Sequence, residues 1–159
     1  MKICILEICP CEPSENHQEV FGKSGLDYFY VSYAEAGANC IKFNKNKSWA
    51  HNRNSLYQHV KGKYDFYFFV DYDIILEAKD GSNPIEKIIT RLKVLNPAMY
   101  RPSGFRGELK LNKGLSVGGF INHSVTIFHR DIVDLVFDLP TKYGGFWDAA
   151  SFINSVIVP

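Results

Sequence analysis

Residues 64–73 read YDFYFFVDYD, and this stretch decides the fold. Every side chain from Phe66 to Val70 is large and apolar, so both faces of the segment must be covered. That pattern is typical of a central strand in a parallel sheet. The strand runs directly into Asp71-Tyr72-Asp73, at the end where open α/β sheets bind their ligands. The stretch therefore predicts an α/β fold with a ligand site at the carboxyl end of this strand.

The segments on either side alternate between short apolar runs and helical patterns. Before the central strand, apolar runs that end in polar or glycine-containing sequence predict strands at residues 2–8, 26–33 and 39–43. A helix is predicted at 48–60, and Ser82-Asn83-Pro84 begins another whose apolar stripe ends at Leu95. The rest of the chain predicts a hairpin over 108–117, a strand over 124–128 and helices over 130–137 and 146–157. We therefore expect β/α units first, followed by a mixed part that lies over the strand ends.

Length and charge limit the partners that the chain can have. It has 159 residues, 46% of them hydrophobic, which predicts one domain with a core of its own. A formal net charge of +1 without a block of Lys and Arg argues against nucleic-acid binding. The first apolar stretch, Ile3 to Ile8, is too short to span a membrane, so we expect no transmembrane segment and a cytoplasmic location. Cysteine spacing fits neither a zinc site nor a C-x-x-C motif, and free thiols are expected at Cys4, Cys9, Cys11 and Cys40.

Asp71 and Asp73 form a carboxylate pair at the end of the central strand. Hard cations such as Mg²⁺ or Mn²⁺ take few protein carboxylates and complete their coordination with water and substrate phosphates. The pair therefore predicts a metal site. The alternative is that these residues only start a turn, because Asp is common after strands.

Arg53 lies on the apolar face of the predicted helix 48–60, four residues after Trp49 and three before Leu56. A guanidinium that points inward keeps its charge, so it must meet a carboxylate, carbonyl groups or a ligand phosphate. The alternatives are a side chain that reaches over the helix edge or a pair with a core Asp. Asn54 is a weaker candidate, because an Asn in a helix is usually exposed. Three histidines are expected to face solvent: His17, His51 and His59.

The late segment KYGGFWDAASFIN, residues 142–154, places Asp148 directly after Phe146-Trp147. One interpretation is a helix cap, because acidic side chains are favoured in the first turn of a helix. The other is a carboxylate beside an aromatic platform, an arrangement that suits a sugar because ring faces stack on aromatics and carboxylates accept hydroxyl protons.

Three of these stretches together resemble the nucleotide-sugar-dependent glycosyltransferases of the GT-A fold. Asn52-Arg53-Asn54 is similar to the family's A-R-N before the central strand, FYFFVDYDIIL resembles its strand with the D-x-D motif, and GGFWDAASFIN is similar to its late G-W-x-x-D segment. The resemblance implies a single-domain Rossmann-like (GT-A) fold over residues 1–159, with a mixed, mainly parallel central sheet flanked by helices. Residues 1–80 would then form the donor nucleotide-binding half and residues 81–159 the acceptor-side half.

The resemblance also implies roles for individual residues. Asp73 would bind a Mn²⁺ or Mg²⁺ ion that bridges the donor diphosphate, and Asp71 would help through the metal or the ribose. Asp148 would be the catalytic carboxylate that takes a proton from a glycan or protein hydroxyl acceptor. The remaining candidates would contact the nucleotide-sugar donor, a UDP-sugar by preference, or the acceptor: Arg53, Asn54 and Glu35 on the donor side and Trp147 on the acceptor side.

Two other classes of protein share part of this sequence pattern. A haloacid-dehalogenase-like phosphatase also places D-x-D after an apolar strand, but near its start and with a Thr or Val where this chain has Ile75. A non-catalytic sugar-binding or nucleotide-binding module is the second alternative, although it has no need of a metal-diphosphate site. A sugar-nucleotide pyrophosphorylase is disfavoured, because its Gly-rich, Arg-containing N-terminal loop is missing.

The role of Asp148 can be tested by Asp148→Asn. Because a general base typically contributes about 10²–10⁴-fold to a rate, we expect kcat to fall by that factor while nucleotide affinity stays unchanged. Measuring kcat and the unfolding midpoint on one preparation separates the two interpretations. A helix cap predicts normal turnover in the folded fraction, and that result would remove Asp148 from the catalytic residues.

Overall fold

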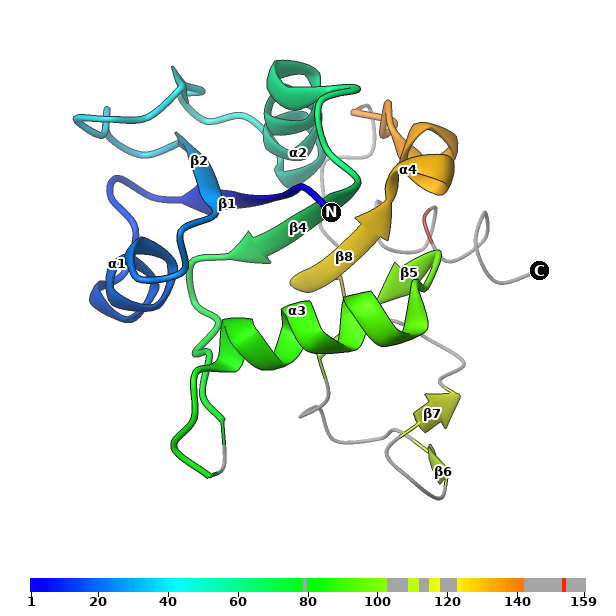
Figure 1. The fold of residues 1–159 in the computed structure, drawn as a ribbon. Helices are drawn as coiled ribbons and strands as arrows, with labels where there is room; N and C mark the ends of the chain where they lie inside the picture. Colours follow the sequence, from blue (N-terminus) through cyan, green and yellow to red (C-terminus); the bar gives the residue numbers. More distant parts are fainter. Residues whose placement is uncertain (79, 103–108, 112–114, 118–122, 142–152, 154–159) are drawn as a thin grey trace.

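A six-stranded mixed sheet forms the centre of the molecule (Figure 1). The computed structural model describes residues 1–78, 80–102, 109–111, 115–117, 123–141 and 153. The strands follow one another across the sheet in the order β3 (Lys42–Phe43), β2 (Asp27–Ser32), β1 (Ile3–Cys9), β4 (Phe66–Asp71), β8 (Val125–His129) and β5 (Met99–Tyr100). The first four are parallel, and β8 is antiparallel to both of its neighbours. The predicted α/β class and mainly parallel sheet are confirmed.

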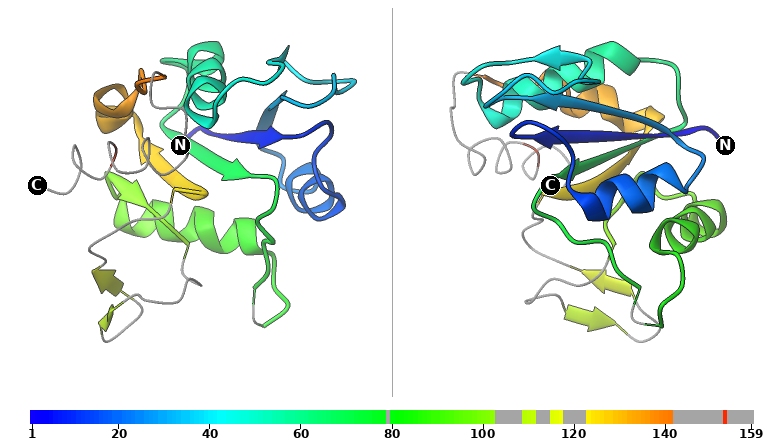
Figure 2. Two further views of the ribbon diagram at one scale, coloured as in Figure 1. Left: turned by 180° about the vertical axis from the view of Figure 1, so that it is seen from behind. Right: turned by 90° about the vertical axis from the view of Figure 1, so that its left-hand side faces the viewer.

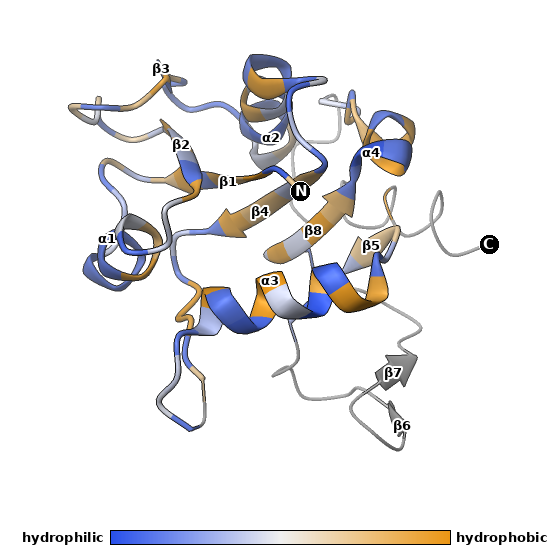
Figure 3. Ribbon diagram, viewed as in Figure 1, coloured by the Kyte–Doolittle hydropathy of each residue, from blue (hydrophilic) through white to orange (hydrophobic). Residues whose placement is uncertain are grey.

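Strands β1 and β4 lie at the middle of this sheet and are covered on both faces. All seven residues of β1 are buried, as are the five apolar residues from Phe66 to Val70 in β4. Figure 3 shows both strands as strongly apolar ribbons between the helices. The apolar run that predicted a doubly buried central strand therefore forms one.

Two pairs of helices cover the two faces of the sheet (Figure 2). On one face, α2 (Trp49–Val60) and α4 (Arg130–Val136) contribute Leu56 and Val133 to one apolar cluster. On the other face, α1 (Glu15–Gly22) and α3 (Pro84–Leu95) contribute Phe21 and Ile88 to a second cluster. Within the described ranges, no helix is both long enough and apolar enough to cross a membrane.

Most of the predicted elements are present. Helix α3 begins at the predicted Ser82-Asn83-Pro84, where the Asn83 side chain accepts from Ile85 N, and α2 is capped by Ser48, whose side chain accepts from His51 N. The hairpin is formed by β6 (Leu109–Leu111) and β7 (Leu115–Val117), which pair antiparallel. All four cysteines are free thiols, as expected. The helix predicted over 146–157 falls outside the described residues except for Ile153, which is helical and buried.

Three features of the fold differ from the sequence prediction. Helix α1 was not predicted, because Pro10 and Pro13 marked its region as a loop. Strand β5 was missed as well, since a two-residue strand carries no periodicity. Strands β8 and β5 from the second half join the main sheet, whereas that half was expected to lie over the strand ends.

The loops after β1 and β2 are joined at the carboxyl edge of the sheet. The carbonyl of Pro10 accepts hydrogen bonds from Ala34 N and Glu35 N, at 2.9 and 3.0 Å. Gly37 allows the two loops to approach closely, because a Cβ atom there would lie only 2.4 Å from the Cys11 carbonyl oxygen. The edge where the ligand site was expected is thus built from closely packed backbone.

Gly37→Ala should destabilise the protein by about 1–3 kcal/mol, the usual cost of forcing extra volume into a packed site. Gly22→Ala is the matched control, because nothing lies within 4 Å of a Cβ atom at that position. The control should leave the free energy of unfolding unchanged or raise it by about 0.4–1 kcal/mol. Urea denaturation of both variants measures the difference, and equal stabilities would show that the loops tolerate a side chain at Gly37.

Candidate functional site

A pocket of about 360 Å³ opens at the carboxyl ends of β1 and β4. Strand β8 is antiparallel to β4, so the residue before its start reaches the same edge of the sheet. The described residues that line the pocket are Ile8, Tyr33, Lys47, Trp49, Asn52, Asp71, Tyr72, Asp73 and Ser124. The structure thus brings both acids of the predicted D-x-D motif into one concave site.

Arg53 is buried and forms an ion pair with the first of these acids. Its side-chain Nη2 lies 2.7 Å from Oδ1 of Asp71 and also donates to the His123 carbonyl, at 3.0 Å. The residue is only 1% exposed, and the Trp49 ring covers its guanidinium at 4.5 Å. The prediction that Arg53 points inward and is partnered inside the protein is therefore confirmed. The partner is a carboxylate of the same site, and Arg53 is not among the residues that line the pocket.

The Asp71 carboxylate is held by two side chains of α2. Besides the ion pair with Arg53, it accepts hydrogen bonds from Trp49 Nε1 on both oxygens, at 3.0 and 3.1 Å. Burial raises the pKa of Asp71, while the Arg53 charge and the hydrogen bonds from Arg53 and Trp49 act against that rise. With its side chain 13% exposed, Asp71 still presents a surface to the pocket.

Asp73 lies in the opposite environment. It is exposed at the pocket, and no hydrogen bond or ion pair to its carboxylate is formed within the part of the chain that the structure describes. No three or more His, Cys, Asp or Glu side chains among the described residues are grouped to hold a metal. Mg²⁺ and Mn²⁺ need only one or two carboxylates when substrate phosphates and water complete their coordination, and Asp73 with Asp71 fits that requirement.

Aromatic side chains form much of the pocket wall. Tyr33, Trp49 and Tyr72 all line it, from the loop after β2, the start of α2 and the D-x-D motif. Burial raises the pKa of Tyr33, and the neighbouring Tyr72 and Asp73 act in the same direction, so the phenol keeps its proton. Lys47 is the one basic residue among the described residues of the lining. The pocket therefore offers flat apolar faces beside carboxylates and a cation.

None of the three residues predicted on the donor side, Arg53, Asn54 and Glu35, lines this pocket. Asn54 is 9% exposed, and its amide is used twice by Leu139: Nδ2 donates to the Leu139 carbonyl and Oδ1 accepts from Leu139 N, at 2.9 and 2.8 Å. Glu35 is exposed on the loop after β2, where its backbone N–H is bonded to Pro10. The acceptor-side residues Trp147 and Asp148 lie outside the described residues.

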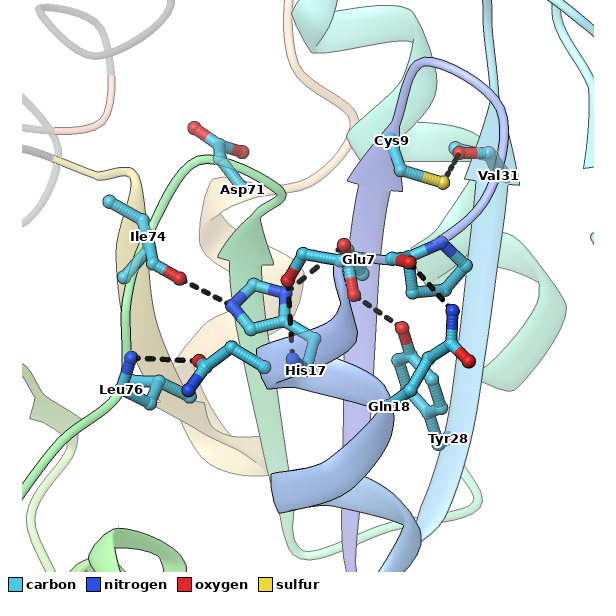
Figure 4. A network of polar contacts seen from close by, with 12 residues as sticks. Glu7, Cys9, His17, Gln18, Tyr28, Val31, Asp71, Ile74 and Leu76 are labelled. Carbon is cyan, nitrogen blue, oxygen red and sulfur yellow. Dashed lines mark hydrogen bonds and ion pairs between the residues drawn. The ribbon is translucent and has the colours of Figure 1, made fainter.

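A buried polar network next to the motif was not predicted (Figure 4). His17 was expected to face solvent, and this is wrong: its side chain is fully buried and lies 3.1 Å from the Glu7 carboxylate. The available signal was Ser14 followed by Glu15, a capping residue and an acid in the first turn, which together mark a helix start at α1. A helix there turns His17 toward the sheet.

Comparisons with known proteins find a structure of similar fold but do not assign the chain to a family. No family model matches the chain, and no curated protein matches it. One similar solved structure is described as the crystal structure of A197 from STIV. The two share 14% sequence identity with a TM-score of 0.51 over 96% of this chain and 78% of that one. This likeness concerns the fold alone.

Arg53→Met should lower the free energy of unfolding by about 3–5 kcal/mol, because it leaves the Asp71 carboxylate buried without its cation. Lys61→Met is the matched control: it removes a pair of similar length, Lys61 Nζ to Asp134 Oδ1 at 2.8 Å, but both of these side chains are about half exposed. The control should cost no more than about 1 kcal/mol. Chemical denaturation measures both changes in the free energy of unfolding. Similar losses for the two variants would show that the buried Arg53–Asp71 pair contributes no more to stability than an exposed pair.

Proposed function

We propose that this protein is a metal-dependent glycosyltransferase that moves a sugar from a nucleoside-diphosphate sugar to an acceptor hydroxyl. The observation that carries the proposal is the state of the two acids: Asp71 is fixed by Arg53, and Asp73 is left exposed beside it in a pocket at the end of the central strand. The mixed, mainly parallel sheet supports the proposal at the level of fold class. The resemblance of the D-x-D stretch to the GT-A glycosyltransferases supplies the reaction.

Asp73 and the pocket-facing side of Asp71 would hold the cation, Mn²⁺ or Mg²⁺. When bound, such a cation stabilises negative charge on a departing diphosphate. Asp71 accepts hydrogen bonds from Trp49 Nε1, so its orientation toward the pocket is set before any ligand arrives. Lys47, on the pocket lining, is placed to meet an anionic part of the donor.

The size and lining of the pocket suit a nucleotide sugar. Ligand pockets typically have volumes of about 300–1,000 Å³. The pocket of about 360 Å³ lies in that range. Tyr33, Trp49 and Tyr72 provide aromatic faces on which a base or a sugar ring can stack.

On the acceptor side, the proposal rests on the sequence pattern: Asp148 would accept the hydroxyl proton, and Trp147 would contact the glycan or protein acceptor. We place this reaction in the cytoplasm.

A thermal-shift experiment tests the donor site. UDP with Mn²⁺ should raise the melting temperature, because a ligand that binds only the folded state stabilises it by about 2.7 kcal/mol at 100 times its Kd. Asp73→Asn should abolish this rise. Asp80→Asn is the control, since Asp80 is an exposed acid that pairs with Lys87 and does not line the pocket.

The other outcomes separate the competing functions. Stabilisation by inorganic phosphate alone would favour a haloacid-dehalogenase-like phosphatase. Metal-dependent binding of UDP without release of UDP from any UDP-sugar, with water or glycans as acceptors, would favour a non-catalytic module. An Asp73→Asn variant that binds UDP and Mn²⁺ as tightly as the wild type would contradict the proposed site.

A further inference from the structure

Glu7 in β1 and His17 in α1 form a buried pair that no part of the proposed chemistry uses. Both side chains are 0% exposed, and Oε1 of Glu7 lies 3.1 Å from Nδ1 of His17. The two atoms lie at ion-pair distance, and neither makes a hydrogen bond of good geometry within the described chain. A carboxylate buried away from water is costly unless a partner meets it, so each of these side chains fixes the other.

The second oxygen of Glu7 is also occupied. The hydroxyl of Tyr28 in β2 donates a hydrogen bond to Glu7 Oε2. Burial raises the pKa of Tyr28, and the Glu7 charge adds to the rise, so the phenol stays protonated as a donor. Residues from β2, β1 and α1 thus form one chain of polar contacts that ends on the His17 ring.

The far side of the ring touches the segment that follows the D-x-D motif. His17 Nε2 lies 2.5 Å from the carbonyl oxygen of Ile74, and Figure 4 shows the ring between this carbonyl and the Glu7 carboxylate. A carbonyl can only accept, so Nε2 carries a hydrogen and donates it. The preceding residue, Asn16, accepts a hydrogen bond from Leu76 N through Oδ1, at 3.1 Å. Two successive residues of α1 therefore hold the backbone at Ile74 and Leu76.

The motif is anchored on its other side by the sheet. The backbone N–H of Asp71 donates to the Ser124 carbonyl at 2.8 Å, and that of Tyr72 donates to the Ile8 carbonyl at 3.2 Å. Asp73 lies between these anchors and those from α1, with its carboxylate exposed at the pocket. Its position is thus set through the backbone on both sides.

We propose that His17, held in place by Glu7, is a positioning residue for Asp73. The assignment rests on the proposed function, because the position of Asp73 matters only if its carboxylate binds a ligand. When the donor on His17 is lost, the Ile74 carbonyl loses its partner and Oε1 of Glu7 is left buried without its neighbour, while Oε2 keeps the hydrogen bond from Tyr28. Residues 72–76 then take up additional conformations, and the Asp73 carboxylate spends less time where the cation and diphosphate meet.

Calorimetric titration of UDP in the presence of Mn²⁺ tests this in three variants. His17→Phe keeps a ring but no donor, and should weaken binding by about 10–100-fold, as is typical for groups that orient metal ligands indirectly. His17→Gln retains an amide N–H at the reach of Nε2 and should restore most of the affinity. Asn16→Ala removes only the bond to Leu76 from a half-buried residue, and should weaken binding by a smaller factor.

Amide hydrogen exchange supplies a readout that needs no ligand. The amides of Tyr72, Ile74 and Leu76 should exchange faster in His17→Phe than in the wild type, while amides in the middle of β4 stay protected. Val133→Ala is the stability control, because Val133 is buried in the apolar cluster on the other face of the sheet, which contains no residue of the segment 72–76. It should lower stability without changing exchange at 72–76 or the affinity for UDP.

Wild-type affinity and unchanged exchange in a folded His17→Phe protein would overturn the assignment. If that variant does not fold, Asn16→Ala decides: wild-type affinity and exchange in this milder variant would equally overturn it. A wild-type protein that binds no UDP with Mn²⁺ would overturn the proposed function, and the positioning role with it. Binding by the wild type with equal binding by the variants would overturn the positioning role alone.

Discussion

The charge of Arg53 is buried and must be compensated inside the protein. The groups that contact its guanidinium build the candidate site. A guanidinium does not lose its proton in a protein, and removing an ion from water costs several kcal/mol. Within the described residues, the acceptors for Arg53 are the Asp71 carboxylate and the His123 carbonyl, and the rings of Trp49 and Phe69 lie over it. These groups come from the start of α2, from β4 and from the residues before β8, so one charge holds three parts of the chain together.

The direction of β8 makes this arrangement possible. Because β8 is antiparallel to β4, the residues before its start lie at the carboxyl end of β4. The His123 carbonyl can therefore accept from Arg53, and the Ser124 carbonyl accepts from the Asp71 N–H. A parallel strand in this position would place its own carboxyl end and the following loop there, and these two carbonyls would lie at the other edge of the sheet. The antiparallel strand thus contributes backbone acceptors to an edge that otherwise consists of parallel strand ends.

Much of this fold could be predicted from the sequence, because its strongest patterns are local. The apolar run from Phe66 to Val70, the helical pattern of residues 48–60 and the helix start at Ser82-Asn83-Pro84 depend only on neighbouring residues, and each forms the element that it predicted. The inward direction of Arg53 also follows from helical spacing. Its partner does not, because a carboxylate, a carbonyl and a phosphate satisfy the same requirement, and the choice depends on where β4 ends in space.

The residues that sequence reasoning missed depend on long-range contacts. His17 is polar and follows two prolines, and only the packing of α1 against the sheet shows that it meets Glu7 and the Ile74 carbonyl. For Asn54 the prediction failed in the opposite direction. Its place next to Arg53 suggested contact with a ligand, but both its Nδ2 and its Oδ1 are hydrogen-bonded to the backbone of Leu139, 85 residues away. Polar side chains in a helix are ambiguous in sequence, because burial alone decides whether their partner is solvent, ligand or backbone.

Asp71 and Asp73 contribute differently to the charge that a cation meets in the pocket. The Asp71 charge is balanced by Arg53, so the net negative charge that the described part of the pocket offers to a cation comes from Asp73, with Lys47 opposing it. A single exposed carboxylate in water holds a divalent cation weakly, and Mg²⁺ keeps most of its water in such a setting. A diphosphate supplies the oxygen ligands and the negative charge that the protein lacks. Under the proposed function, the arrangement would therefore favour joint binding of the cation and the nucleotide over a resident metal, since the described residues provide no group of three metal ligands.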